Sequence, residues 1–347
     1  MRIGTAGFVA ARLTSAREAR GVTQSDLAER TGIKPQSICH YEQGRQSPSP
    51  EALALLAEKL SLPERHFLRP LPPDSAGLHA RLGWLRELAA YVRRFVELPP
   101  VQLPLVDLRE AVCVESAAET ARTFFRTGSG PIASMTILLE NHGCIVARLP
   151  GSHGHPFQFA TLLDGQPYMG LDLESPPSTV RYSAARALGS LVLGGDAARD
   201  PLHDRFARAF LMPARTFGPE VWSPTLDAML GLKRTWNCPI GAIVHRCVDL
   251  GLLDEEHARR LVANMARRGW KSDEPGEHDQ AQESPRILAQ SLRLMLDSGV
   301  KDVHTLLADL ALGSSDVEQL AGLPNGFLRE AEPPAAWAPR LRQAAAG

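Results

Sequence analysis

Residues 21–60 read GVTQSDLAERTGIKPQSICHYEQGRQSPSPEALALLAEKL, and short helical patterns alternate in them with signals that start and stop a helix. Thr23 followed by Asp26 has the spacing of a capping box, and Gly32 is typical of the end of a helix. Pro35 suits the first turn of the next helix, because its missing N–H would be unpaired there in any case. The stretch therefore predicts two short helices separated by a three-residue turn.

Further helices extend this unit on both sides. FVAARLTSAREAR (8–20) has apolar residues at helical spacing. Ser49 as N-cap and Pro50 at the first helical position open the helix EALALLAEKL. We expect residues 1–72 to form a small domain of five helices, which the Pro-rich stretch RPLPPDSAG (69–77) ends.

Ten residues of this domain stand at the spacing of a known DNA-binding family: Arg17, Gln24, Leu27, Ala28, Gly32, Ile38, Tyr41, Glu42, Gly44 and Pro48. On these residues the segment resembles the XRE family of phage-repressor-type helix-turn-helix domains. The resemblance implies that the helix over 35–43 lies in the major groove of a double-stranded DNA operator. It also implies that Arg17 and Glu42 are a structural pair and bind each other rather than DNA.

If the domain docks as the family does, the start of the 35–43 helix faces the base edges. Gln36 would then pair with adenine, and His40 lies one turn further along the same face. Gln24 and Arg45 are predicted to contact phosphates. The complete set of predicted DNA-contacting residues is Gln24, Lys34, Pro35, Gln36, Ser37, His40 and Arg45. Pro35 departs from the polar residue usual at its position, and the alternative for Gln36 and His40 is a solvated surface.

The charge of the chain is unevenly distributed. Residues 1–70 hold ten Lys or Arg and seven Asp or Glu, a net charge of +3, whereas the whole chain carries -1. The rest of the chain therefore carries -4. A basic N-terminal end agrees with a polyanionic partner such as DNA.

The chain of 347 residues is too long for one ordinary domain, and it is 44% hydrophobic, so it can bury a sizeable core. We predict a mainly α protein with an α+β middle domain, because short β-type runs (CIVARL, FQFATLL, PYMGLDL) alternate there with helical runs. The predicted parts after the first domain are a connecting helix and linker over 73–100, an α+β domain over 101–228, a helical C-terminal regulatory part over 229–335 and a flexible tail over 336–347.

Three segments in the body of the chain stand in a familiar order and spacing: ILLENHGCIVARL (137–149), RYSAARALGSLVLGG (181–195) and FARAFLMP (206–213). With them, the region over about 95–330 resembles the ImmA/IrrE family of zinc-peptidase-like domains, which are often fused behind an XRE head. The resemblance implies a zincin-like fold for the α+β domain.

Members of that family carry His-Glu-x-x-His in the helix of the second segment. The two histidines bind zinc, and the glutamate is the base for the attacking water. In this chain those positions are Arg186, Ala187 and Ser190, and a fourth, acidic ligand position falls at Asp200. One carboxylate cannot hold zinc, so the resemblance implies a pseudopeptidase with no catalytic residues, no metal and no cofactor.

Other residues leave alternatives open. His142, His153, His155 and His203 are candidates for a rebuilt metal site, although His153 and His155 stand in a Gly- and Pro-flanked loop. The five cysteines form no CxxC motif, which favours free thiols in a reducing cytoplasm. Cys238 and Cys247 are expected to be buried, with a redox role as the alternative. Trp236 and Trp270 are expected in the core, with a dimer interface as the alternative.

These observations predict a cytoplasmic, sequence-specific transcriptional regulator. It would bind an operator as a homodimer, and its body would be either a sensor of a small-molecule effector or an oligomerisation module. No stretch of about 18 apolar residues predicts a membrane span, and the N-terminus lacks the pattern of a signal peptide. The alternatives are an active zinc endopeptidase that cleaves a repressor or antitoxin, and an antitoxin-like autorepressor that binds a protein partner.

Overall fold

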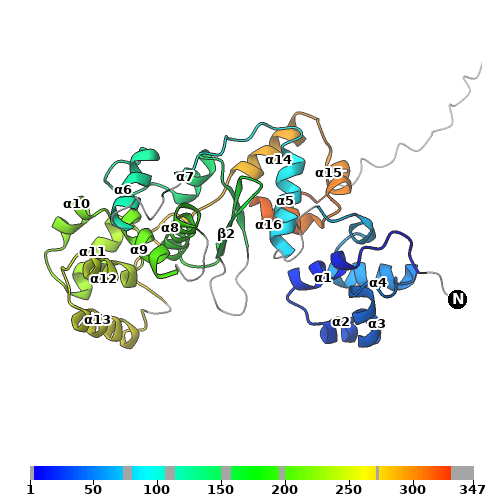
Figure 1. Cartoon of the computed structure of the whole chain (residues 1–347), viewed down its shortest axis with the longest axis horizontal. Coiled ribbons are helices and arrows are strands. Elements are labelled where there is room, and N and C mark those ends of the chain that lie inside the picture. The colour runs from blue at the N-terminus through cyan, green and yellow to red at the C-terminus, as the bar shows by residue number, and fades with distance from the viewer. Residues whose placement is uncertain are drawn as a thin grey trace, which may run out of the picture. The chain divides into compact units, whose positions relative to one another are not determined.

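A computed structural model describes residues 4–72, 80–104, 106, 114–149, 158–194, 200–270 and 273–329. The chain forms two compact units (Figure 1). Unit 1 combines the N-terminal residues up to 73 with 292–319 and the residues from 323 onward, and unit 2 contains 74–291 with 320–322. Within the described residues, no helix is long and apolar enough to cross a membrane. The predicted tail over 336–347 lies outside the described residues.

Unit 1 is helical. Its N-terminal part contains α1 (Ala10–Ala19), α2 (Gln24–Thr31), α3 (Pro35–Glu42), α4 (Pro50–Leu60) and the 3-10 helix η1 (Glu64–Leu68), and its C-terminal part contains α15 (Val303–Leu310) and most of α16 (Ser314–Ala321). The predicted helix starts at Thr23 and Ser49 are confirmed, because each side chain accepts a hydrogen bond from the backbone N–H three residues further on.

The core of unit 1 comes from the apolar faces of these helices. Leu13 of α1, Leu27 of α2, Ile38 of α3, Leu56 of α4 and Phe67 of η1 are completely or almost completely buried. Each lies at a position that the helical periodicity places on the inner face of its helix. Burial of such side chains contributes about 1.5–3 kcal/mol each.

Residues 303–319, here called the C-terminal clasp, are bonded to the N-terminal helices of the same unit. Arg20 at the end of α1 donates from both Nη atoms to the carboxylate of Asp316, at 2.6 and 2.8 Å. Gly313 lies so close to the end of α4 that a Cβ in its place would stand 2.9 Å from the carbonyl oxygen of Ser61. A larger residue at 313 would therefore force the clasp away from α4.

His66 of η1 makes a second, buried connection to the clasp. Its Nδ1–H donates to the carbonyl oxygen of Ala311, 3.0 Å away. Burial, followed by the charges of Arg12 and Arg69, lowers the pKa of His66 to about 3, so the ring is neutral near pH 7. Arg69 adds a hydrogen bond of 2.6 Å from its Nη1 to the carbonyl oxygen of Asp309.

The observed division differs from the predicted boundaries, which kept 229–335 as one helical part. The chain leaves unit 2 within α14 (Ile287–Asp297), and most of the residues C-terminal to that point belong to unit 1. The physical reason is a set of polar contacts between distant parts of the chain: Arg20 and Asp316 are 296 positions apart. No local pattern of residues encodes such a contact.

Unit 2 is an α+β unit. It contains α5 (Ala80–Val92), α6 (Val114–Phe124), α7 (Met135–Asn141), β1 (Ile145–Arg148), β2 (Gln158–Leu163), β3 (Gln166–Leu171), α8 (Pro177–Leu193), α9 (Asp200–Leu211), α10 (Ala214–Phe217), the 3-10 helix η3 (Gly218–Glu220), α11 (Leu226–Trp236), α12 (Ile240–Asp249) and α13 (Glu255–Arg267). The three predicted β-type runs are confirmed as strands. The predicted connecting segment over 73–100 contributes α5, and its residues 73–79 lie outside the described part.

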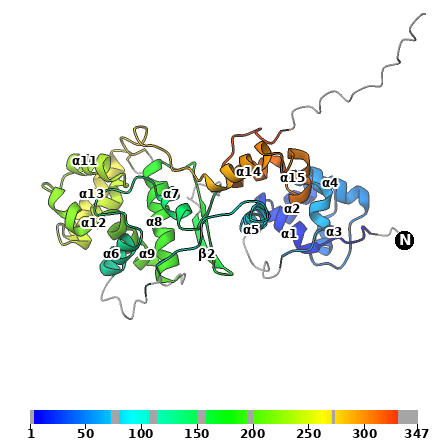
Figure 2. The same cartoon turned by 90° about the horizontal axis from the view of Figure 1, so that it is seen from above.

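The three strands form one small sheet in the order β1-β3-β2. β3 pairs parallel with β1, where Ile145 is opposite Tyr168, and antiparallel with β2, where Thr161 is opposite the same Tyr168. Two views of the unit agree that α8 lies beside this sheet (Figure 1 and Figure 2). The helix that contains Arg186, Ala187 and Ser190 is therefore backed by the sheet.

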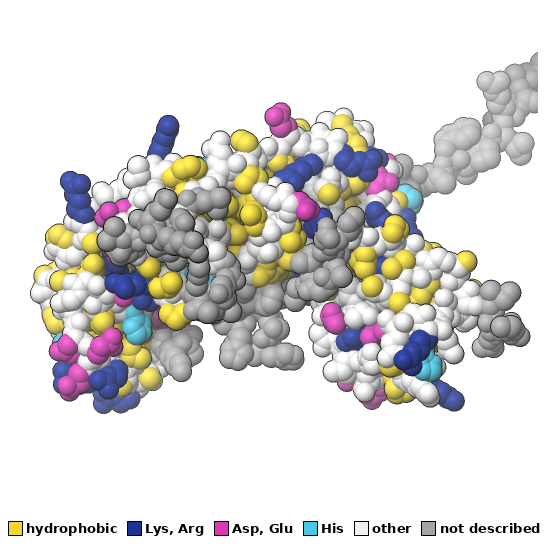
Figure 3. Space-filling model, viewed as in Figure 1, with side chains coloured by type: hydrophobic (Ala, Val, Ile, Leu, Met, Phe, Trp, Pro, Cys, Tyr) yellow, Lys and Arg dark blue, Asp and Glu magenta, His cyan; other side chains and the backbone are white. Residues whose placement is uncertain are grey.

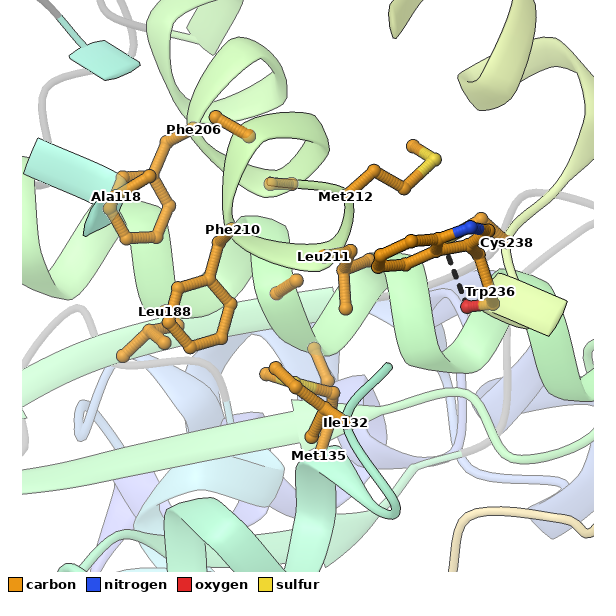
Figure 4. Close-up of a cluster of buried hydrophobic side chains, with 14 of the residues drawn as sticks. Ala118, Ile132, Met135, Leu188, Phe206, Phe210, Leu211, Met212, Trp236 and Cys238 are labelled. Atoms are coloured by element: carbon orange, nitrogen blue, oxygen red, sulfur yellow. Dashed lines mark hydrogen bonds between the residues drawn. The ribbon is translucent and has the colours of Figure 1, made fainter. Parts of the chain in front are cut away.

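The core of unit 2 is built around α8 and α9. Phe206 and Phe210 of α9 stack with ring centroids 5.6 Å apart and lie beside Leu188 of α8 (Figure 4). Gly189 permits the close approach of the two helices, because a Cβ there would stand 3.0 Å from the ring of Phe206. Trp236 is 2% exposed and belongs to the same core, as the sequence predicts.

Acidic residues of the polar segment 273–285 reach into unit 2. Glu277 bonds the side chain of Ser178 at the start of α8 and pairs with the buried ammonium of Lys233. Glu283 accepts from backbone N–H groups at the start of α7, at 2.9 and 3.1 Å. Carboxylates at these helix N-termini satisfy N–H groups that have no partner within the helix. The segment, polar in sequence, is therefore part of the packed unit.

We predict that Asp316→Ala destabilises unit 1, because it leaves the guanidinium of Arg20 without its carboxylate. The expected loss is about 2 kcal/mol, the size of a hydrogen-bonded charge pair that is largely removed from water. Hydrogen exchange followed by mass spectrometry should show faster exchange of the α1 and α4 amides. Asp297→Ala, an exposed change in the same unit, is the control. Equal exchange in both variants would show that the clasp contributes nothing to stability.

Candidate nucleic-acid interface and former metal positions

Two short helices, α2 and α3, hold the candidate DNA-reading surface. Thr23 and Asp26 form a reciprocal capping box at the start of α2, with both hydrogen bonds at 3.1 Å. α2 ends at Gly32, whose φ of 68° lies in the left-handed region that favours glycine. After this turn α3 begins with Pro35 at its first position. The predicted capping box and both helix boundaries are confirmed.

The carboxylate of Glu42 connects α3 with the two preceding helices. Arg17 of α1 donates to it from Nε at 2.6 Å and from Nη2 at 3.1 Å. Gln24 of α2 donates from Nε2 at 2.7 Å. The side chains of Arg17 and Glu42 are only 13% and 5% exposed. Their hydrogen bond raises the pKa of the Arg17 guanidinium.

The structure thus brings Arg17 and Glu42 together and adds Gln24 to the pair. Sequence reasoning placed the Gln24 amide on a DNA phosphate, whereas in the structure this amide donates to Glu42. The reason is that the amide lies next to the largely buried carboxylate of Glu42, whose oxygens can accept several hydrogen bonds. Gln24 and Glu42 are 18 positions apart, and no local spacing signals their contact. The N-terminal turn of α2 can still offer backbone N–H groups to a phosphate.

The outer face of α3 carries the other predicted contact residues. Lys34, Pro35 and Gln36 are exposed, and Ser37 and His40 are half-buried. Within the described residues, the Gln36 side chain makes no hydrogen bond. Basic and histidine side chains gather over α3 in the space-filling view (Figure 3).

Arg45 is exposed just beyond the end of α3. Its backbone N–H donates to the carbonyl of His40 at 2.9 Å, which keeps this residue close to the helix. Ile38, on the opposite side of α3, is completely buried. A helix with one buried face and one exposed polar face can lie against a major groove and donate or accept there.

The four positions that correspond to the metal motif by resemblance lie on α8 and at the start of α9. Arg186 pairs with Asp200 at 3.3 Å, from Nη2 to Oδ2, and with Asp204 at 3.2 Å, from Nε to Oδ1. Ala187 is buried, and the Ser190 hydroxyl donates to the Ala187 carbonyl at 2.9 Å. A guanidinium thus stands against the one acidic residue of the set.

Two of the candidate histidines of the body are described, and both are engaged with protein atoms. His203 is 3% exposed, with Nε2 3.0 Å from the carbonyl oxygen of Gly194 and Nδ1 3.5 Å from Asp200. His142 bonds the carbonyl of Leu138 through Nδ1 at 2.8 Å. Among the residues that the structure describes, no three His, Cys, Asp or Glu side chains form a group that could hold a metal ion. The candidates His153 and His155 lie outside those residues.

Three cysteines in the described part of the body are buried, and for Cys238 and Cys247 this confirms the prediction. Cys144, Cys238 and Cys247 are each 0% exposed. Burial raises the pKa of the Cys238 thiol to about 12 and that of Cys247 to about 11. These thiols are protonated at neutral pH, and a protonated, inaccessible thiol is a poor nucleophile. Their environment does not favour the redox alternative.

Comparison with known proteins agrees with the geometry of the N-terminal unit. A family model described as a helix-turn-helix domain matches residues 9–67, which cover α1 to η1 almost completely. No curated protein matches the chain. The matched domain, with its exposed reading helix, indicates a DNA-binding regulator.

We predict that Glu42→Ala lowers the free energy of unfolding of unit 1 by about 3 kcal/mol, because it leaves the largely buried charge of Arg17 with only the more distant and exposed Glu18, 3.8 Å away. Urea denaturation followed by far-UV circular dichroism measures this change. Glu29→Ala, an exposed substitution on α2, should change stability by less than about 0.5 kcal/mol. If both variants unfolded at the same urea concentration, Glu42 would not be the centre of this network.

Proposed function

We propose that the protein is a cytoplasmic, sequence-specific transcriptional regulator whose α3 reads an operator in the major groove. The observation that carries this proposal is the exposed Gln36 side chain on a helix held from behind by Arg17 and Glu42. A bidentate amide contact with adenine would supply about 1–3 kcal/mol of discrimination at that base. Lys34 and Arg45 flank the reading face and would contact phosphates, which makes binding strongly salt-dependent.

For unit 2 we propose a degenerate ImmA/IrrE-like module without catalytic activity. The ion pair between Arg186 and Asp200 supports this proposal, because it sets a permanent cation at the positions where the resemblance predicts zinc ligands. A cation and a bound Zn²⁺ repel each other. The module would instead respond to a small-molecule effector or join two chains as a homodimer. Two heads could then read half-sites about one helical turn apart.

The proposed role of Gln36 in base recognition can be tested on selected DNA. Duplexes selected by the full-length protein from a random pool supply a preferred sequence, and its affinity is compared with that of a scrambled duplex. Gln36→Ala should weaken binding to the preferred sequence roughly 5- to 100-fold, the effect of losing one bidentate contact. Binding to the scrambled duplex should not change. Gln290→Ala, an exposed glutamine far along the chain, is the control.

Two results would contradict this role of α3. One is that the full-length protein selects no sequence. The other is that Gln36→Ala retains the full preference for the selected duplex. If the affinity for the selected duplex did not fall as the salt concentration rises from low to physiological, this would count against phosphate contacts in general.

The proposal for unit 2 also predicts the zinc content of the protein. Protein purified without a chelator or a metal-affinity tag should contain far less than one zinc per chain, measured by atomic emission, and a chelator should leave DNA binding unchanged. Zinc near one per chain that is lost in Asp200→Ala but kept in Asp227→Ala, an exposed control, would favour the peptidase alternative.

A further inference from the structure

A hollow of about 390 Å³ opens on unit 2, away from α8 and the former metal positions. It lies between the end of α6, the loop after that helix and the start of α10. Polar side chains line it: Glu119, Arg122, Thr123, Arg126, Ser129 and Arg215. Three arginines face one glutamate, so the hollow carries a net charge of about +2 and favours an anion.

Arg122 lies at the inner side of this hollow and is 5% exposed. Its guanidinium donates to three backbone carbonyls: from Nε to Gly128 at 2.8 Å, from Nη1 to Phe210 at 2.5 Å and from Nη2 to Gly130 at 2.5 Å. A guanidinium has five N–H groups, so two remain, one on each Nη. The three carbonyls fix the orientation of the guanidinium at the wall of the hollow.

The charge of Arg122 has no carboxylate partner among the described residues. The three carbonyls supply only dipoles, and burial lowers the pKa of Arg122 to about 10. The side chain is still a cation near pH 7. A buried cation without a counter-charge is costly, and an anion in the hollow would offset part of that cost.

Arg126 and Arg215 stand at the rim with exposed side chains, and within the described chain neither forms an ion pair. Their backbones are nevertheless held in place. The N–H of Arg126 donates to the carbonyl of Thr123 at 3.2 Å. The hydroxyl of Thr216, next to Arg215, donates to the carbonyl of Ser129 at 2.6 Å, which ties α10 to the loop. The rim therefore presents two cationic side chains from backbone segments that are held in place.

We propose that this hollow binds a small oxyanion, the phosphate or carboxylate group of a metabolite, between Arg122, Arg126 and Arg215. The planar guanidinium fork matches such groups and donates two parallel hydrogen bonds to them. The Thr123 and Ser129 hydroxyls line the same hollow and can add neutral donors. That the oxyanion acts as an effector rests on the proposed regulatory function, whereas its binding does not.

Calorimetric titration of the full-length protein, without DNA, tests the binding. Inorganic phosphate and succinate are titrated separately at constant ionic strength set with chloride, so the two arms distinguish a phosphate site from a carboxylate site. At least one should bind saturably with one site per chain. Arg126→Ala and Arg215→Ala should each weaken that binding about tenfold, as expected for the loss of one charge-assisted contact. Arg234→Ala, an exposed change on α11, should leave it unchanged.

The proposal is overturned if neither anion binds saturably, or if the binding is the same in Arg126→Ala, Arg215→Ala and Arg234→Ala. Far-UV circular dichroism of each variant shows that the fold is intact. The effector role is tested separately, on the duplex selected by the protein. A several-fold change in DNA affinity at saturating anion supports that role, and an unchanged affinity overturns it. Failure of DNA selection itself would instead contradict the proposed function.

Discussion

The DNA-binding unit depends on the hydrogen bonds that the carboxylate of Glu42 accepts from two other helices. This carboxylate receives hydrogen bonds from Arg17 of α1 and Gln24 of α2, and it belongs to α3 itself. One largely buried anion therefore sets the relative position of three helices. Because the apolar side of α3 is buried at Ile38, this arrangement leaves Gln36 facing solvent. The exposed face of α3 follows from how these helices are held as much as from the residues that it carries.

Long-range ionic contacts recur in the rest of the chain. In unit 1, Asp316 supplies the counter-charge of Arg20, so the end of the chain contributes to the unit that carries the reading helix. In unit 2, Glu277 compensates the buried Lys233. Removing one member of such a contact leaves a charge shielded from water, which costs more than the pair contributes. Arg122 differs from these side chains, because its hydrogen bonds go to backbone carbonyls and it pairs with no carboxylate among the described residues.

Sequence reasoning was most successful where the signal is short-range. The capping box at Thr23 and Asp26 and the N-cap at Ser49 were predictable because a cap acts over three residues. The strands of the small sheet were predictable from short, mostly apolar runs. The roles of Gln24 and of Glu277 were not, because each depends on a partner at least 18 positions away. The spacing of polar residues in the sequence does not predict which distant residue each of them contacts.

The sequence by itself determined the helix-turn-helix pattern and the polar residues at the start of its second helix. Only the tertiary structure decided that the C-terminal clasp joins the N-terminal unit, that Arg186 pairs with Asp200, and that Arg122 lies beside two further arginines around one hollow. The physical reason is the distance along the chain over which each kind of interaction acts. Capping and periodicity act between neighbours in the chain, whereas charge compensation and burial depend on which distant segments the fold brings together.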